Sequence, residues 1–117
     1  FIGSPQMNLF KCKIENGIAK IGDNHIKLDN SINLDDATVG IRPDDMIVSE
    51  NGLYNCKANL VEYLGSDMII YSSMDNQDFS LKLSSKIDLK ADENFKFDIP
   101  SSLLHIFDNS TDQRVKN

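Results

Sequence analysis

The amino-acid sequence predicts an all-β domain with little helix, on three observations. Apolar and polar residues alternate over many short stretches, as they do in strands with one buried face. Turn residues separate these stretches, including two Asn-Gly pairs, Asn16-Gly17 and Asn51-Gly52, and Asn-Gly is the strongest short hairpin pattern. The chain has 117 residues, which is enough for one domain with a modest core.

The alternation predicts the position of each strand, and the spacing of the strands predicts the kind of β architecture. A polar loop is expected over 29–36 and one short helical turn over 100–104. Short strands at regular spacing favour a small barrel or sandwich. A five-stranded Greek-key barrel of the OB type, with appended strands, fits the length. The predicted strands lie at 7–14, 18–21, 25–28, 38–42, 54–64, 68–71, 79–83, 95–99 and 105–108.

A sharp corner follows the predicted strand at 38–42. Gly40 has no Cβ, so another backbone or an aromatic ring is expected to come close there. Pro43 cannot donate a hydrogen bond to a neighbouring strand, so the strand should end at Arg42. The Arg42 guanidinium could then fork onto a carboxylate and lock the corner. A looser copy of this corner occurs at 97–103. The candidate carboxylates are Asp44, Asp45 and Glu62.

The charge of the chain argues against nucleic acid and membrane surfaces as partners. Twelve basic and eighteen acidic residues give a net charge of −6. Phosphate contacts supply most nucleic-acid affinity, and this chain has no cluster of basic residues to make them. Aromatic residues make up only 8%, so base-stacking platforms are also scarce. No apolar run approaches the length needed to cross a membrane.

The cysteines and histidines do not form a recognisable reactive site. Cys12 and Cys56 have no metal-ligand spacing, and each falls at an inward-facing position of a predicted strand. We expect two buried free thiols acting as small hydrophobes, which fits a reducing cytoplasm. His25 and His105 have no nucleophile near them in sequence. The sequence therefore predicts no catalytic, cofactor-binding or metal-binding residue.

Two further features could suggest catalysis but do not support it. The acidic pairs at 35–36 and 44–45 are expected to be solvated turn residues rather than acid–base or metal-binding carboxylates. The chain also lacks both the G-x-x-x-x-G-K-[ST] and the G-x-G-x-x-G phosphate-binding patterns.

Four stretches together resemble a known family of transport proteins. They are FIGSPQMN at 1–8, VGIRPDD at 39–45, VEYLGSD at 61–67 and LHIFD at 104–108. In this order and spacing they look like the C-terminal regulatory region, of the TOBE or OB type, in the ATP-binding subunit of MalK-like sugar ABC importers. The stretch before Pro100 departs from the family pattern, and the loops are unusually rich in Asn and Asp.

The resemblance implies a division of labour within a longer protein. Residues 1–108 would form the regulatory domain and 109–117 a polar, frayed tail. A missing N-terminal part would bind ATP and Mg and carry the ABC ATPase activity, so this fragment would be no enzyme and hold no cofactor. The implied partners are a second copy of the subunit in a homodimer, the membrane permease subunits and a regulatory protein. The implied location is cytoplasmic, on the inner face of the plasma membrane.

The same resemblance suggests a surface for regulators. A turn at the end of the long predicted strand would be exposed, and exposed loop residues can serve recognition without a cost to the core. The residues expected to contribute to this surface are Leu9, Gly40, Glu62, Tyr63, Gly65 and Asp67.

Two alternatives stay open at this point. The chain could be a ligand-binding TOBE or OB module for an oxyanion or an oligosaccharide, although its low basic content argues against an oxyanion unless backbone N–H groups bind it. A stand-alone OB nucleic-acid binder is the other alternative, and the charge argues against it.

Overall fold

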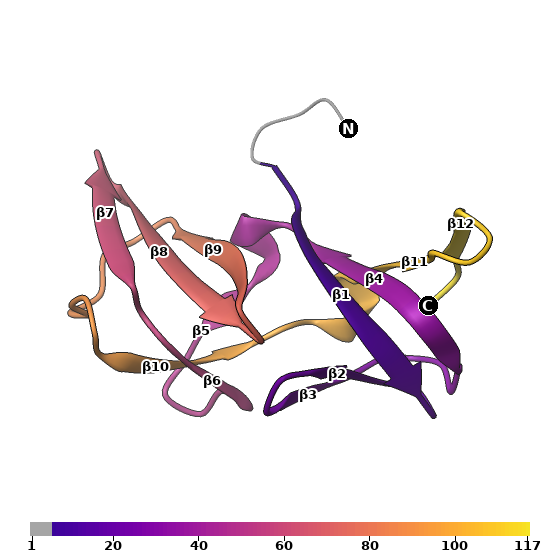
Figure 1. The fold of residues 1–117 in the computed structure, drawn as a ribbon. Coiled ribbons are helices and arrows are strands. Elements are labelled where there is room, and N and C mark those ends of the chain that lie inside the picture. Colours follow the sequence, from indigo (N-terminus) through magenta and orange to yellow (C-terminus); the bar gives the residue numbers. More distant parts are fainter. Residues whose placement is uncertain (1–5) are drawn as a thin grey trace.

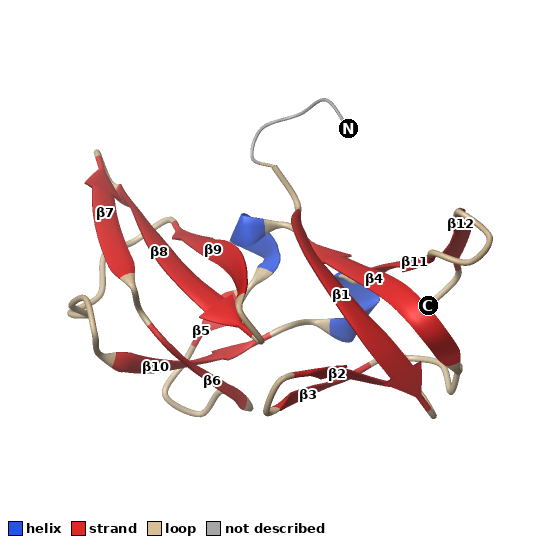
Figure 2. Cartoon of the chain, in the orientation of Figure 1, coloured by secondary structure: helices blue, strands red, loops and turns tan. Residues whose placement is uncertain are grey.

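The computed structural model describes residues 6–117, and these residues form an almost wholly β structure (Figures 1 and 2). The prediction of an all-β chain with little helix is confirmed. In the described part of the chain no helix is suited to crossing a membrane. The FIGSP opening at 1–5 lies outside the described residues. The elements are β1 (Asn8–Glu15), β2 (Ile18–Ile21), β3 (Asn24–Lys27), β4 (Leu34–Ile41), η1 (Pro43–Asp45), β5 (Ile47–Val48), β6 (Tyr54–Lys57), β7 (Leu60–Leu64), β8 (Asp67–Met74), β9 (Gln77–Leu83), β10 (Asn94–Asp98), η2 (Ser101–Leu103), β11 (His105–Asp108) and β12 (Gln113–Val115), where η marks a 3₁₀ turn.

The largest sheet has six strands in the order β12-β11-β4-β1-β2-β3. Its first hairpin confirms a prediction from the sequence, because Asn16 and Gly17 join β1 to β2 with φ angles of 50° and 74°. Two positive φ angles are what a type I′ turn requires, and Asn and Gly accept them most readily. The strand β4 begins at Leu34, so residues 34–36, expected in a loop, belong to a strand instead, and Leu34 pairs with Ile14 of β1 beyond a register shift.

Two three-stranded sheets complete the fold, in the orders β5-β10-β6 and β7-β8-β9. The prediction of one strand over 54–64 is wrong, because β6 and β7 belong to different sheets. The switch occurs at Ala58 and Asn59. The Ala58 N–H donates to the Glu93 carbonyl at 2.8 Å, and the Asn59 N–H donates to the Tyr71 carbonyl at 2.7 Å. The chain thus passes from one sheet to the next through a bend at Asn59.

The three sheets share one hydrophobic core with Phe97 at its centre. Phe97 is fully buried, and its ring lies 5.4–5.9 Å from the rings of Tyr54, Phe79 and Phe95. Phe79 also meets Phe10 of the six-stranded sheet edge to face, with 5.3 Å between ring centroids. These side chains come from β1, β6, β9 and β10, so the aromatic cluster joins all three sheets.

The predicted closed barrel is not formed by main-chain pairing, since the three sheets stay separate. Side-chain amides bridge the seam between β1 and β9 instead. The Asn8 amide donates to the Ser80 carbonyl at 2.8 Å and accepts from the Ser80 N–H at 3.0 Å. The Gln77 amide bonds the Lys11 backbone in the same two-way manner, at 3.0 and 2.7 Å. Each amide thus replaces a peptide group of a neighbouring strand.

A second seam, between β3 and β6, is bridged by a side-chain amide in the same way. The Asn24 amide donates to the Asn55 carbonyl at 3.4 Å and accepts from the Asn55 N–H at 3.5 Å. Beside it, the Lys27 N–H donates to the Tyr54 hydroxyl oxygen at 3.4 Å. Polar side chains therefore connect the sheets at places where strands of different sheets do not pair.

Both predicted corners are present. β4 ends at Ile41, one residue earlier than expected, and Arg42 is extended before Pro43 opens η1. The second corner has Pro100 directly before η2, and that 3₁₀ turn confirms the short helical turn expected over 100–104.

The end of the chain differs from the frayed tail that the sequence suggested. β12 pairs with β11, with Phe107 opposite Arg114. The Asn117 amide donates to the Ser101 carbonyl at 2.6 Å and accepts from the Asp29 N–H at 2.8 Å. These bonds hold the terminal segment against the six-stranded sheet and the second corner.

Candidate functional site

The predicted recognition residues on the β7–β8 hairpin lie together at an exposed tip. Gly65 makes the turn with a φ of +62°, and no atom lies within 4 Å of the position that a Cβ would occupy. Tyr63 is 54% exposed, and the Lys86 ammonium lies over its ring at 5.4 Å from the centroid. Asp67 begins β8 and forms an ion pair with Lys82 at 3.7 Å. The tip therefore presents an aromatic ring and charged groups to solvent.

Glu62 is held in place on the outer face of this hairpin. The Tyr71 hydroxyl donates to a Glu62 carboxylate oxygen at 2.6 Å. This hydrogen bond, with burial and the negative charge adding to it, raises the pKa of Tyr71 above its usual value. Glu62 was one candidate partner for Arg42, but it lies on a different sheet and its carboxylate is engaged by Tyr71.

The other two predicted recognition residues, Leu9 and Gly40, are direct cross-strand neighbours on β1 and β4. Leu9 is half exposed and Gly40 is buried. A Cβ on Gly40 would lie 2.5 Å from the Met7 sulfur and 3.2 Å from a Leu9 methyl group. The expectation of a backbone or an aromatic ring over Gly40 is therefore wrong, because two flexible side chains cover it. The structure brings Leu9 to Gly40 but leaves both on a different sheet from the β7–β8 tip.

Because the Met7 and Leu9 side chains lie over Gly40, larger side chains at this position should destabilise the protein progressively. Gly40→Ala should cost less than about 1 kcal/mol of unfolding free energy, because the end of Met7 can move aside. Gly40→Val should cost about 1–3 kcal/mol, since its second methyl group also meets Leu9. Urea unfolding of both variants measures the difference. Equal midpoints for the two variants would show that the neighbours of Gly40 do not resist a larger side chain.

The face of the sheet beside Leu9 carries a groove of about 570 Å³, which we call the arginine groove. Arg42 lines it at the end of β4, His105 lines it from β11 and Arg114 from β12. A guanidinium nitrogen of Arg114 lies 2.6 Å from His105 Nδ1, which can only accept a hydrogen bond from it. The residues that line the groove are Gln6, Met7, Leu9, Thr38, Arg42, His105, Phe107, Asn109 and Arg114.

The protonation of His105 reflects these neighbours. Burial lowers the pKa of His105, and the positive charges of Arg114 and Arg42 lower it further, while Asp45 acts in the opposite direction. The imidazole is therefore neutral at pH 7, which leaves Nδ1 free to accept from Arg114. Both guanidinium groups are close enough to His105 to act on the same ring.

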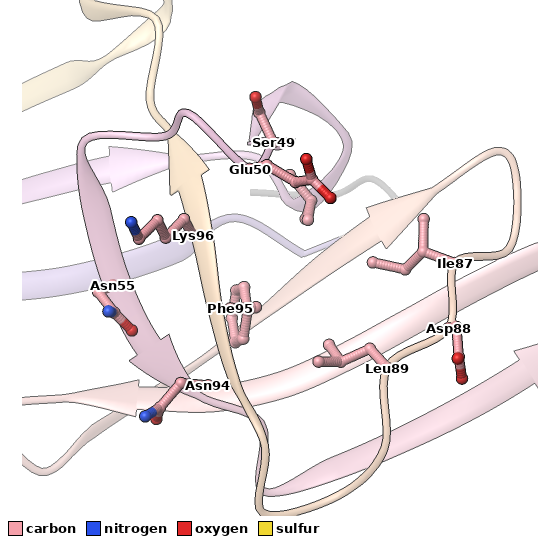
Figure 3. Close-up of a pocket in the computed structure, with 10 residues that line it drawn as sticks. Ser49, Glu50, Asn55, Ile87, Asp88, Leu89, Asn94, Phe95 and Lys96 are labelled. Carbon is pink, nitrogen blue, oxygen red and sulfur yellow. The ribbon is translucent and has the colours of Figure 1, made fainter.

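A second hollow, of about 580 Å³, lies along β10 (Figure 3). β5 pairs only with Phe97 and Asp98, so the first half of β10 has no strand on that side. Ile87, Asp88 and Leu89 border this hollow in Figure 3, with Phe95 between them and β6. Its remaining lining combines an apolar edge with amides, hydroxyl, ammonium and carboxylate groups, which suit the hydroxyls of a neutral polar ligand such as a sugar. Those lining residues are Val48, Ser49, Glu50, Asn55, Asn94 and Lys96.

Sequence reasoning missed both hollows. His105 was weighed only as a catalytic residue, and Arg114 was placed in the tail. One signal was available, because Arg42 and Arg114 are the only arginines in the chain. Within residues 6–117 no group of three or more His, Cys, Asp and Glu side chains could hold a metal ion. Cys56 is buried as expected, and Cys12 is only partly buried.

Comparison with known proteins finds a family model that matches the first part of the chain. Residues 3–46, which include β1 to β4 and the corner at Pro43, match the family model of the MalK OB fold domain. This part of the chain is therefore similar to the MalK OB fold domain. The resemblance drawn from the four sequence stretches is thereby confirmed.

Several proteins are similar to this chain over nearly all of its length. The oligosaccharides import ATP-binding protein MsmX of Bacillus subtilis is 33% identical over 132 residues, covering 99% of this chain and 36% of MsmX. The sn-glycerol-3-phosphate import ATP-binding protein UgpC 2 of Agrobacterium fabrum is 32% identical and covers 99% of this chain and 33% of its own length. The putative ABC transporter ATP-binding protein MG187 of Mycoplasma genitalium is 29% identical, over 99% of this chain and 20% of its own. The chain thus spans about a third or less of the length of these relatives.

Proposed function

We propose that this MalK OB fold domain is the regulatory and dimerisation part of the ATP-binding subunit of an importer for a sugar or for glycerol phosphate. The observation that carries the proposal is the similarity, over 99% of the chain, to MsmX and UgpC 2, two proteins named as import ATP-binding proteins. The matched domain is an OB fold, a β architecture that serves binding and assembly in many proteins.

In this proposal the domain takes no part in the chemistry of ATP hydrolysis. ATP and Mg would bind elsewhere in the full-length subunit, which would sit on the cytoplasmic side of the membrane beside permease subunits. The domain would keep two subunits together while their nucleotide-binding parts open and close. A tethered partner meets its mate at a high effective concentration, so one lasting contact makes repeated closure efficient.

The exposed edge strand β7 is the part of the described chain that best suits a regulatory partner. Leu60 and Leu64 are 52% and 55% exposed, and β7 is an edge of its sheet. Exposed edge strands can pair with a strand from another chain. Glu62 is the central residue of β7, so pairing of two β7 strands centred on it would place two carboxylates opposite each other, which is unfavourable. A partner protein with complementary positive charge therefore fits this edge better than a second copy.

The test uses the full-length subunit assembled in its transporter. Glu62→Lys should leave the melting temperature nearly unchanged, because Glu62 is exposed and its bond to Tyr71 contributes little at the surface. Sugar-stimulated ATPase activity should stay within about twofold of that of the unchanged protein. The same change should remove inhibition by the regulatory protein. Asp23→Lys is the matched control, since it makes the same charge change at the exposed turn between β2 and β3. If ATPase activity and inhibition fall together, the hairpin is structural or lies in the subunit interface, and the assignment is wrong.

A further inference from the structure

We propose that the arginine groove binds a small organic phosphate, such as a phosphorylated sugar. This ligand site is additional to the proposed regulatory and dimerisation role, and it does not depend on that role. The proposal rests on how the cationic side chains of the chain are distributed, on the neighbours of His105 and on the composition of the groove.

Arginine is rare among the basic residues of this chain, and it occurs at one place. The chain has twelve basic residues, but only Arg42 and Arg114 are arginines, and both line the same groove. They are 72 positions apart in the sequence, and Arg42 directly follows β4 whereas Arg114 lies on β12 of the same six-stranded sheet. The planar guanidinium binds phosphate and carboxylate oxygens through two parallel hydrogen bonds, which an ammonium group does not do. The groove thus concentrates the residue type that is best suited to an oxyanion.

Both arginines line the same groove as His105. Arg114 touches His105 Nδ1, and the charges of both arginines act on the same imidazole ring. A phosphate ester has three terminal oxygens and up to two negative charges, so it can accept from two guanidinium forks at once. A single carboxylate has only two oxygens, and one fork occupies both. Two arginines in one groove therefore favour phosphate over a monocarboxylate.

Nearby carboxylates reduce the overall positive charge of the groove. Asp45 acts on His105, and Asp36 accepts from the Asn109 amide at 2.9 Å. The Thr38 hydroxyl donates to the Asn109 amide oxygen at 3.1 Å, so the polar wall is already ordered. Selectivity would then come from the geometry of the two forks rather than from a broad positive field, which matches a small ligand better than an extended polyanion.

The remaining lining of the groove suits the organic part of such a ligand. Met7, Leu9 and Phe107 supply apolar surface next to the polar wall. Its volume of about 570 Å³ lies within the range of small-molecule sites, about 300–1,000 Å³. A phosphate bound to a carbon skeleton would therefore use both walls, whereas inorganic phosphate would use one.

The test is a calorimetric titration of the chain with glucose 6-phosphate in low salt. We expect saturable binding, weaker binding of inorganic phosphate and none of glucose. Arg114→Gln should weaken glucose 6-phosphate binding about tenfold or more, since it removes charge-assisted hydrogen bonds. Lys27→Gln should leave the affinity unchanged, because Lys27 is an exposed cation on β3, the opposite edge strand of the same sheet.

A second measurement protects the test from a folding artefact. In wild-type protein, glucose 6-phosphate but not glucose should shift the NMR signals of the His105 ring, while those of His25 on β3 stay fixed. Absence of saturable binding by any of the phosphates would overturn the proposal. Equal weakening by Arg114→Gln and Lys27→Gln would overturn it too, because it would indicate attraction to overall charge. Binding of an acidic peptide in place of the sugar phosphate would show that the groove is a protein-docking surface and would also overturn it.

Discussion

Gly52→Ala is expected to lower the free energy of unfolding by about 3 kcal/mol or more. A Cβ on Gly52 would lie 2.4 Å from the Phe97 nitrogen and 2.7 Å from its Cα and carbonyl carbon. These are backbone atoms of the central strand of the β5-β10-β6 sheet, and Phe97 is fully buried in the aromatic cluster. The Phe97 side of the contact cannot move without displacing core side chains, so even one methyl group is too large.

Gly65→Ala is the matched control for this prediction. Gly65 has a φ of +62° and open space around it, so its substitution should cost only about 1–2 kcal/mol for the unfavourable backbone conformation. Urea unfolding of both variants, with the denaturant dependence checked for constancy, gives the comparison. A loss for Gly52→Ala no larger than that for Gly65→Ala would show that the segment carrying Gly52 can lift away from β10.

The two Asn-Gly pairs show how far local sequence rules reach. Asn16-Gly17 forms the tight hairpin turn that the pair predicts, because both residues take positive φ angles and the strands on either side pair directly. Asn51-Gly52 also lies in a turn, closed by the Gly52 N–H and the Ser49 carbonyl at 3.0 Å. The flanking strands β5 and β6 do not pair, since β10 lies between them. Gly52 is needed for its approach to Phe97, and that contact has no local pattern.

The alternation of apolar and polar residues predicted most strand positions, because it too is a local property of the sequence. Positions of β2 and β11 agree with the prediction, because one buried face imposes a period of two. Over 54–64 the alternation continues through Ala58 and Asn59, where the chain leaves one sheet for another. Tyr54, Cys56 and Ala58 are buried, whereas β7 has only the half-buried Val61 on its inner face, so the period in the sequence gives no sign of the switch. Only the distant carbonyls of Glu93 and Tyr71, which accept from the two N–H groups, determine it.

The candidate sites were predicted less completely than the fold. The exposed β7–β8 tip was found because Gly65 marks a turn between two strong strand patterns. The arginine groove was missed because its side chains come from four strands and from residues before β1. Arg42 was considered only as part of a corner, and Arg114 falls in a polar segment whose pairing with β11 depends on tertiary contacts.

Asn8→Ala is expected to destabilise the protein by about 2–4 kcal/mol, because it removes both bonds that join β1 to β9 at Ser80. Asn8 is only 7% exposed, so water cannot easily replace the lost amide. The Ser80 N–H and carbonyl would then lose partners in a partly buried site, and such groups cost more than the bond itself contributes.

Gln77→Ala is the comparison that separates the effect of burial on stability from the effect of the number of hydrogen bonds lost. Gln77 also makes two amide bonds to a strand backbone, at Lys11, but these bonds are exposed to solvent. Water can satisfy the Lys11 groups after the substitution, so the loss should stay below about 1 kcal/mol. Thermal and urea unfolding of the two variants measure the contrast. If the two losses are equal, the seam between the sheets is held by the aromatic cluster, and the buried amide of Asn8 serves only to fill space. A larger loss for Asn8→Ala would mean that this buried side chain does the work of a missing strand pairing.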